Sequence, residues 1–303
     1  MGHNHKRQIK GKNLLITILL NFSITVAEVV GGLLSGSLSL LSDALHNLSD
    51  GVSIIISYFA LKISQRDNNE KMTYGYKRAE ILAALFNSSV LFIICIYLLK
   101  EAYFKFLNPE PINGLLMLSI AVIGLAANTF SVFLLKDNAA DNINIKSAYM
   151  HLFADALSSF GVVFGGILIY FYNIYWIDPL ITVLIAIYIG KGSFGILGET
   201  VRILMQGAPE SINIEKIREE VEKIPLVEDI HHLHLWQNND HDILAEFHIK
   251  VEEDLRLSQA DKIRNDIAEL LEKEFSITHF TIQMEYDCCQ NENLIKRNFR
   301  RAN

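Results

Sequence analysis

Six long apolar runs dominate the chain up to about residue 200. They predict membrane-spanning helices near residues 14–34, 38–63, 79–106, 112–135, 147–172 and 177–197. Each run reaches the roughly 20 residues that a helix needs to cross the hydrocarbon of a bilayer. A cleaved signal peptide does not explain the first run, because it lacks a small-residue cleavage site and further runs follow it. The pattern therefore predicts an all-α transmembrane domain with six helices.

The connections between these runs differ in charge, which predicts the orientation of the chain. The first, third and fifth connections are short and carry no Lys or Arg, whereas the leader and the other two connections are basic. The basic residues are Lys6, Arg7, Lys10 and Lys12, then Lys62, Arg66, Lys71, Lys77 and Arg78, then Lys136 and Lys146. Because basic loops stay on the cytoplasmic side of a membrane, we expect both termini in the cytosol.

Beyond residue 206 the pattern changes to that of a small water-soluble α/β domain. Apolar residues at helical spacing predict helices over 212–224 and 258–275, the second with Ser258 as its N-cap. Alternating apolar residues predict strands over 230–236, 243–251 and 278–285. The order αββαβ predicts a modest core on one side of a three-stranded sheet.

Composition supports this division. Half of the residues are hydrophobic, which is too many for an ordinary soluble surface. Residues 1–206 carry 15 Lys and Arg against 13 Asp and Glu, whereas residues 207–303 carry 12 against 21. This balance argues against nucleic-acid binding. We expect a cytosolic leader over 1–12, a six-span transmembrane domain over 13–206, a cytosolic domain over 207–290 and a tail over 291–303.

Three cysteines are too few for a disulfide framework. Cys95 lies in an apolar run and is expected to be a packing residue. Cys288 and Cys289 are adjacent, which indicates free thiols in a reducing compartment, or soft metal ligands.

Ionisable side chains within the predicted spans follow a repeated pattern. His46 and Asp50 in the second span are four residues apart, as are His151 and Asp155 in the fifth. This separation puts both members of a pair on one helix face. Two such faces opposed offer two imidazoles and two carboxylates, which suit a tetrahedral divalent metal such as zinc better than calcium or magnesium. An ionisable group at mid-membrane indicates function, and we expect a metal site here.

Each pair alone could instead be a helix-stabilising ion pair. Two identical pairs on separate spans, without Lys or Arg near mid-membrane, argue against that alternative. Asp43 lies three residues before His46 and could orient an imidazole as a hydrogen-bond acceptor. We rank it below the four residues of the two pairs. Glu28, in the first span, is expected to line the same polar cavity.

Four stretches carry a resemblance to a known family: GGLLSGSLSLLSDALHNLSDG, YGYKRAE, HLFADALSS and HHLHLW. From about residue 12 to residue 285 the chain resembles the cation diffusion facilitators, in particular the zinc-exporting members of the bacterial inner membrane. The resemblance implies a homodimer with six spans and a cytosolic ferredoxin-like domain of the metallochaperone type. It also implies exchange of a divalent metal for protons, with His46, Asp50, His151 and Asp155 as the transport site. A histidine at the first position resembles zinc-type members more than manganese- or iron-type ones.

The resemblance also implies a second metal site in the cytosolic domain, formed by His231, His248 and Glu285. Six of the ten histidines lie in this acidic part of the chain: His231, His232, His234, His241, His248 and His279. Where relatives often have a further histidine, this chain has Gln283, which is a poorer ligand. Cys288 or Cys289 could replace it.

The sequence therefore predicts a secondary transporter that is not an enzyme and that exports zinc or another divalent cation in exchange for protons. Zinc would be both the transported and the regulatory ion, no cofactor is needed, and the partners are the lipid bilayer and a second copy of the chain. Imidazole binds metal only when neutral, so protons and metal compete for the site. An intramembrane zinc-dependent enzyme and a membrane metal sensor are the alternatives. Four protein ligands leave no open position for a catalytic water.

Overall fold

The protein is described from a computed structural model. The structure describes residues 11–136, 143–239, 242–287 and 294–295. Within these ranges, only the backbone is described for residues 11–21, 134–136, 143–149 and 151. The chain forms two compact units. One comprises Met1–Tyr58 with Phe86–Leu197, and the other Phe59–Leu85 with Gly198–Asn303. Each unit has an apolar core of its own.

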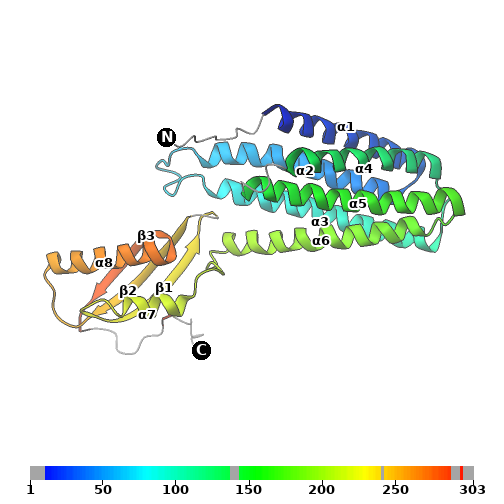
Figure 1. The fold of residues 1–303 in the computed structure, drawn as a ribbon. Coiled ribbons are helices and arrows are strands. Elements are labelled where there is room, and N and C mark those ends of the chain that lie inside the picture. The colour runs from blue at the N-terminus through cyan, green and yellow to red at the C-terminus, as the bar shows by residue number, and fades with distance from the viewer. Residues whose placement is uncertain (1–10, 137–142, 240–241, 288–293, 296–303) are drawn as a thin grey trace. The chain divides into compact units, whose positions relative to one another are not determined.

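The first unit consists of the greater part of six long helices that run side by side (Figure 1). They are α1 (Gly11–Ser35), α2 (Leu38–Ser64), α3 (Arg78–Leu107), α4 (Gly114–Lys136), α5 (Ile143–Tyr172) and α6 (Ile177–Leu204). Among the described residues, α3 to α6 each contain a stretch long and apolar enough to cross a membrane. In α2, the polar residues Asp43, His46 and Asp50 lower the mean hydropathy. In α1, the described side chains form the apolar but shorter stretch Phe22–Ser35.

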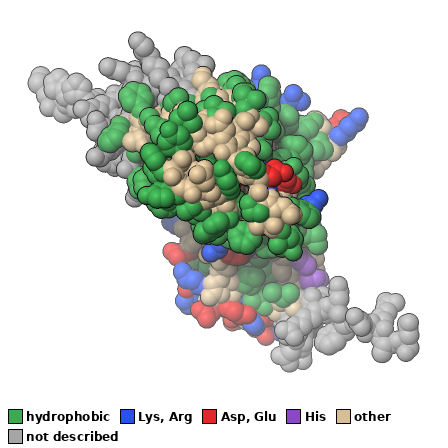
Figure 2. All heavy atoms as spheres, turned by 90° about the vertical axis from the view of Figure 1, so that its right-hand side faces the viewer, with side chains coloured by type: hydrophobic (Ala, Val, Ile, Leu, Met, Phe, Trp, Pro, Cys, Tyr) green, Lys and Arg blue, Asp and Glu red, His purple; other side chains and the backbone are tan. Residues whose placement is uncertain are grey.

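The surface of the helical unit is apolar, as a membrane requires. Hydrophobic side chains cover most of its face in Figure 2, whereas acidic and basic side chains gather on the α/β unit. Large side chains such as Ile123, Phe133 and Phe164 are more than half exposed in the isolated chain. An apolar surface of this extent marks contact with lipid or protein. The expectation of a helical membrane domain is confirmed.

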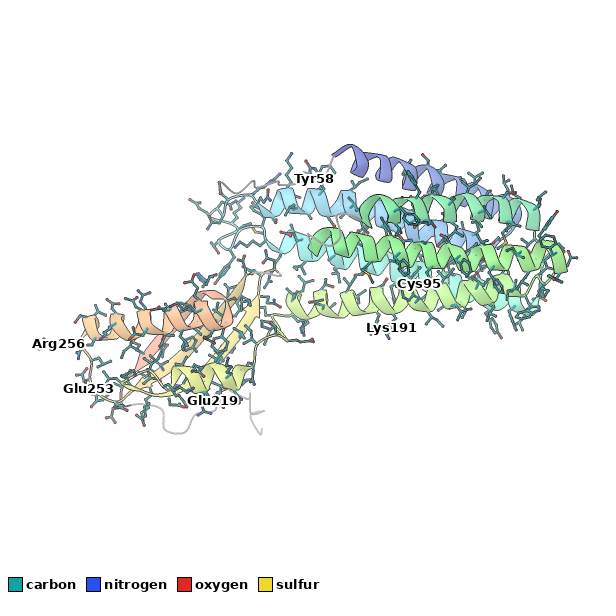
Figure 3. All side chains as sticks on the ribbon, viewed as in Figure 1. Tyr58, Cys95, Lys191, Glu219, Glu253 and Arg256 are labelled. Atoms are coloured by element: carbon teal, nitrogen blue, oxygen red, sulfur yellow. The ribbon has the colours of Figure 1, made fainter. Side chains whose placement is uncertain are left out.

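Close approach of α4 and α5 depends on two glycines. A Cβ atom on Gly166 would lie 3.3 Å from the Cα atom of Leu118, and one on Gly114 would lie 2.9 Å from the Cα atom of Tyr170. Small residues allow such contacts between membrane helices. Cys95 is buried in the same core, as expected of a packing residue (Figure 3).

The last helix of the bundle is longer than predicted. The apolar run ends near residue 197, but α6 continues to Leu204. Lys191 lies in the middle of α6, where it is exposed on the outer side of the helix (Figure 3). Glu199 and Arg202 interrupt the apolar run but not the helix, because the backbone hydrogen bonds of a helix do not require apolar side chains.

The start of α2 is held by a carboxylate from α6. Asp178 is fully buried, and its oxygens accept hydrogen bonds from the backbone N–H groups of Leu38 and Ser39, at 2.7 and 3.1 Å. The hydroxyls of Ser37 and Ser39 donate to the same carboxylate, at 2.7 and 2.6 Å. The first N–H groups of a helix lack partners within the helix, and a negative charge beside them is favourable.

The predicted αββαβ order of the second unit is confirmed. Its elements are α7 (Ile214–Val221), β1 (Val227–Gln237), β2 (Ile243–Val251), α8 (Leu257–Phe275) and β3 (Ile277–Glu285). The expected N-cap Ser258 is wrong: α8 begins at Leu257, and its N-cap is Arg256, two residues before Ser258. The side chain of Gln259 accepts a hydrogen bond from the Arg256 backbone N–H at 3.0 Å and stabilises this earlier start.

The sheet has the order β1-β2-β3. β1 and β2 are antiparallel, and β3 is parallel to β2 because α8 crosses between them. Buried residues from both helices, such as Ile217 and Ile267, pack with Phe247 and Ile249 of β2 in one core. Glu219, Glu253 and the N-cap arginine of α8 lie on the surface of this unit (Figure 3).

Candidate metal centres

The first cluster lies in the helical unit. Nε2 of His46 lies 3.5 Å from an oxygen of Asp50 on the same helix face and 3.4 Å from an oxygen of Asp155 on α5. Asp155 is buried, and the other two side chains are partly buried. One ligand atom from each of the three residues lies within 4.8 Å of the others, which is close enough to share one ion. The spacing of four residues on α2 produces this geometry.

The fourth residue of the predicted set lies outside the described side chains. The structure places only the backbone of His151, in α5 and four residues, one helical turn, before Asp155. His151 therefore lies on the same face of α5 as Asp155. The membrane site thus has three described candidate ligands from two helices, and His151 as a fourth candidate on sequence grounds.

Asp43 is tied to α5. Its two carboxylate oxygens accept hydrogen bonds from the hydroxyls of Ser158, at 2.7 Å, and Ser159, at 2.8 Å. Ser159 in turn accepts a hydrogen bond from the side-chain amide of Asn128 on α4, at 2.9 Å. Asp43 therefore links α2 to the helix that carries Asp155. The sequence suggested an imidazole as the partner of Asp43, whereas its described hydrogen bonds are with serines.

Glu28 is buried beside the same part of α2. The side-chain amide of Asn47 donates a hydrogen bond to it at 3.3 Å, across the α1–α2 contact. Glu28 is not a member of the three-residue cluster. The helical unit therefore contains the buried carboxylates of Glu28 and Asp43, which accept hydrogen bonds from polar side chains of neighbouring helices.

The second cluster lies in the α/β unit, where each strand supplies one residue. His231 on β1 pairs directly with His248 on β2, and Glu285 lies near the end of β3. Nε2 of His231 lies 3.2 Å from one oxygen of Glu285, and Nδ1 of His248 lies 2.8 Å from the other. Ligand atoms of all three lie within 4.8 Å of one another. Two imidazole nitrogens and one carboxylate oxygen form a donor set that suits zinc.

The charge of Glu285 is stabilised in place. Burial works against ionisation, but a hydrogen bond from Gln283 and the neighbouring His248 and His231 outweigh it and lower the pKa of Glu285. Nε2 of Gln283 donates to Glu285 at 2.6 Å. Gln283, which the sequence marks as a poor ligand, thus orients a better one.

The neighbouring histidines differ. β1 is irregular between His231 and His234, and His232 has a φ of 55° there. An irregularity of this kind changes the face to which a side chain points. The ring of His232 lies 4.7 Å from that of His248, centroid to centroid, whereas His234 is exposed. His241, Cys288 and Cys289 lie outside the described residues.

Two residues near the second cluster were missed by the sequence analysis. Asp229 accepts a hydrogen bond from Nδ1 of His231, at 3.1 Å, and Arg218 on α7 donates to Asp229, at 3.0 Å. Asp229 had a signal, since a residue two positions before a histidine on a strand shares its face. Arg218 had none, because its position depends on how α7 packs.

Comparisons with known proteins agree with this architecture. The cation efflux transmembrane domain matches residues 14–205, and the cytoplasmic domain of cation efflux proteins matches residues 209–287. The first match contains the membrane cluster and the second contains the sheet cluster.

Curated relatives align over nearly the whole chain. The cadmium, cobalt and zinc/H(+)-K(+) antiporter of Bacillus subtilis (strain 168) is 35% identical over 97% of this chain and 95% of its own length. The zinc transporter ZitB of Pectobacterium atrosepticum is 36% identical, over 96% of this chain and 91% of its own. The ZitB protein of Escherichia coli (strain K12) is 32% identical, over 95% and 94%. As its sequence predicts, the chain belongs to the cation diffusion facilitator family of cation efflux proteins.

Proposed function

We propose that this protein exports divalent metal, zinc foremost, across a membrane in exchange for protons. The observation that carries the proposal is the membrane cluster, in which His46 and Asp50 of α2 and Asp155 of α5 converge. Such groups are costly within hydrocarbon unless they serve an ion. The names of the relatives support the same function, since they describe zinc transport and antiport of zinc with protons.

His46, Asp50, His151 and Asp155 would form the transport site. Metal and protons compete for it, because imidazole binds metal only in its neutral form. A site open to the cytosol loses protons and loads zinc. The same site open to a more acidic compartment takes up protons and releases zinc. Alternating exposure of one site thereby couples the two gradients, with basic loops and both termini in the cytosol.

His231, His248 and Glu285 would bind zinc as a regulatory ion in the cytosolic domain. This site lies in the part of the chain that matches the cytoplasmic domain of cation efflux proteins, and homodimers would form through that domain. The relatives are named as transporters and antiporters, and an enzyme function gains no support from them.

The test is metal-driven proton flux in proteoliposomes that contain the purified protein. With a proton gradient, zinc should move and collapse the gradient, and cadmium and cobalt should serve as comparison ions. Asp155→Asn should abolish zinc flux, because it removes one negative charge from a buried site with little change in shape.

Ser193→Ala is the matched control. Ser193 is also buried in the helical unit, but its hydroxyl donates only to its own helix, to the Ile189 carbonyl at 3.0 Å, and normal flux is expected. Normal zinc flux in Asp155→Asn would overturn the assignment of the transport site. Wild-type protein without any metal-dependent proton movement would overturn the transport function itself.

A further inference from the structure

A chain of four side chains leads from helix α7 to the sheet cluster. Arg218 donates from Nη2 to one oxygen of Asp229 at 3.0 Å, and the other oxygen of Asp229 lies 3.1 Å from Nδ1 of His231. Nε2 of the same ring lies 3.2 Å from Glu285. Every contact is within hydrogen-bond distance, and the ring of His231 is fully buried in the middle of the chain.

This arrangement determines which ring nitrogen of His231 can bind metal. An ionised carboxylate only accepts hydrogen bonds, so Asp229 requires a proton on Nδ1. In the neutral ring the lone pair is then on Nε2, the nitrogen that faces Glu285. Carboxylates that hold metal-binding histidines in this way orient the ring and raise its basicity.

Arg218 fixes the orienting carboxylate. Its Nε donates to Glu222 on the same helix at 2.8 Å while Nη2 donates to Asp229. The hydrogen bond to Glu222, together with the charges of Glu222 and Asp229, outweighs the effect of burial and raises the pKa of Arg218. A guanidinium donates in a fixed planar geometry, so the position of α7 and the position of Asp229 depend on each other.

We infer that Asp229, held by Arg218, is a positioning residue that presents Nε2 of His231 to zinc and thereby ties α7 to the occupancy of the cytosolic site. The inference rests on the proposed role of His231, His248 and Glu285 as ligands. Metal at this site would restrain α7, the first helix after α6 in the sequence.

The neighbouring residue Glu228 offers a matched control. It lies next to Asp229 on β1 and carries the same charge, but it accepts from Lys250 on the neighbouring strand, at 2.8 Å. Glu228→Gln therefore removes a carboxylate and one cross-strand ion pair without touching His231. Exposed pairs of this kind contribute little to stability.

The experiment measures zinc binding to the full-length protein in detergent, by competition with a chelator. The background carries Asp50→Ala and Asp155→Ala, so that binding reports the cytosolic site. Asp229→Asn should weaken zinc binding by about 10- to 100-fold, the usual effect of losing such a partner. Glu228→Gln should leave it within about twofold of the background, Arg218→Gln should cause a smaller loss than Asp229→Asn, and Asp229→Glu should restore part of the affinity.

A second readout separates positioning from a purely structural role. Zinc should raise the unfolding temperature of the background protein, since a ligand that binds only the folded state stabilises it. In Asp229→Asn the metal-free unfolding temperature should stay near that of the background, while the increase caused by zinc should shrink. Hydrogen exchange of the α7 amides should slow on zinc binding in the background and not in Asp229→Asn.

His231→Ala in the same background separates the two ways of failing. If this variant binds zinc as tightly as the background, the cytosolic ligand set is wrong, and the inference falls with it. If His231→Ala loses binding but Asp229→Asn retains it, the ligand set stands and the positioning role alone is overturned. A metal-free unfolding temperature that drops in Asp229→Asn, with unchanged zinc affinity, would reduce Asp229 to a structural residue.

Discussion

The two metal clusters use similar residues on different supports. In the membrane cluster, Asp50 and Asp155 meet His46 at the contact of two helices. In the sheet cluster, the three strands that supply the ligands are paired through backbone hydrogen bonds, with an irregularity of β1 directly after His231. Packed helices can shift or tilt against one another, whereas strands in a ladder keep their register.

The difference matches the two tasks that we propose for the clusters. A transported ion must be released in each cycle, so its ligands should lie on elements that can separate. A resident ion should find ligands that are already in place. In the sheet cluster, Asp229 is hydrogen-bonded to the imidazole of His231, and Gln283 is hydrogen-bonded to the carboxylate of Glu285. Beside the membrane cluster, Asp43 accepts hydrogen bonds from the serines of α5. Those contacts join the two helices that carry the candidate ligands.

After Asp155→Asn, the largest effect is expected from His151→Ala. If α5 contributes an imidazole as well as Asp155, loss of this ligand should lower zinc flux by more than about 100-fold. Even the loss of a residue that only hydrogen-bonds to a metal ligand lowers metal affinity or activity by about 10- to 100-fold. Zinc flux in proteoliposomes is the measurement, with Ser193→Ala as the control. Flux near the wild-type level would leave the membrane site with the three ligands that the structure brings together.

A change of ligand type should alter selectivity. His46→Asp replaces a borderline nitrogen donor with a hard oxygen donor, which suits manganese better than zinc. The ratio of zinc flux to manganese flux should fall by about tenfold, equivalent to about 1.4 kcal/mol. Flux assays with both ions measure it. An unchanged ratio would mean that the shape of the cavity selects the metal.

Removing the sheet cluster should change regulation without removing transport. In the double variant His231→Ala/His248→Ala, the cytosolic zinc concentration for half-maximal flux should shift by about fivefold, at the lower end of the usual coupling between sites. Flux at saturating zinc should persist, because the membrane ligands are untouched. If a properly assembled double variant shows no flux at any zinc concentration, the sheet cluster belongs to the ion path and the contrast between the two sites collapses.

Asp43→Asn should have the smallest effect on zinc. The amide keeps one acceptor oxygen for Ser158 or Ser159 and loses the other hydrogen bond, which is worth about 1 kcal/mol. A small decrease in unfolding temperature is expected, with the zinc concentration for half-maximal flux within about threefold of wild type. Loss of flux comparable to that of Asp155→Asn would place Asp43 among the essential residues.

Periodicity in the sequence was enough to predict the elements of both units. Apolar runs located the helices, alternation located the strands, and the four-residue spacing of His46 and Asp50 put them on one face. Element ends were less well predicted, because capping depends on particular side chains. The start of α8 is an example, because the side chain of Gln259 accepts a hydrogen bond from the backbone N–H of the N-cap residue Arg256.

Contacts between distant segments could not be predicted in this way. The hydrogen bonds of Asp178 to the start of α2 and the pairing of Arg218 with Asp229 follow from tertiary packing, and nothing in the local pattern encodes them. The same holds for the partners of Asp43. A buried acidic residue in a sequence signals a need for partners, but the fold decides which side chains meet that need.

The parallel pairing of β3 with β2 has a consequence for synthesis. His231 and Glu285 are 54 residues apart, and Glu285 arrives only after α8 has been made and has crossed the sheet. A chain that stops before β3 has both imidazoles and no carboxylate to complete the set. If zinc binds here as proposed, the full ligand set exists only once β3 has been synthesised and has paired with β2, and nascent or truncated chains would gain less stability from the metal. Occupancy of the sheet cluster would then report that the domain is finished as well as that zinc is present.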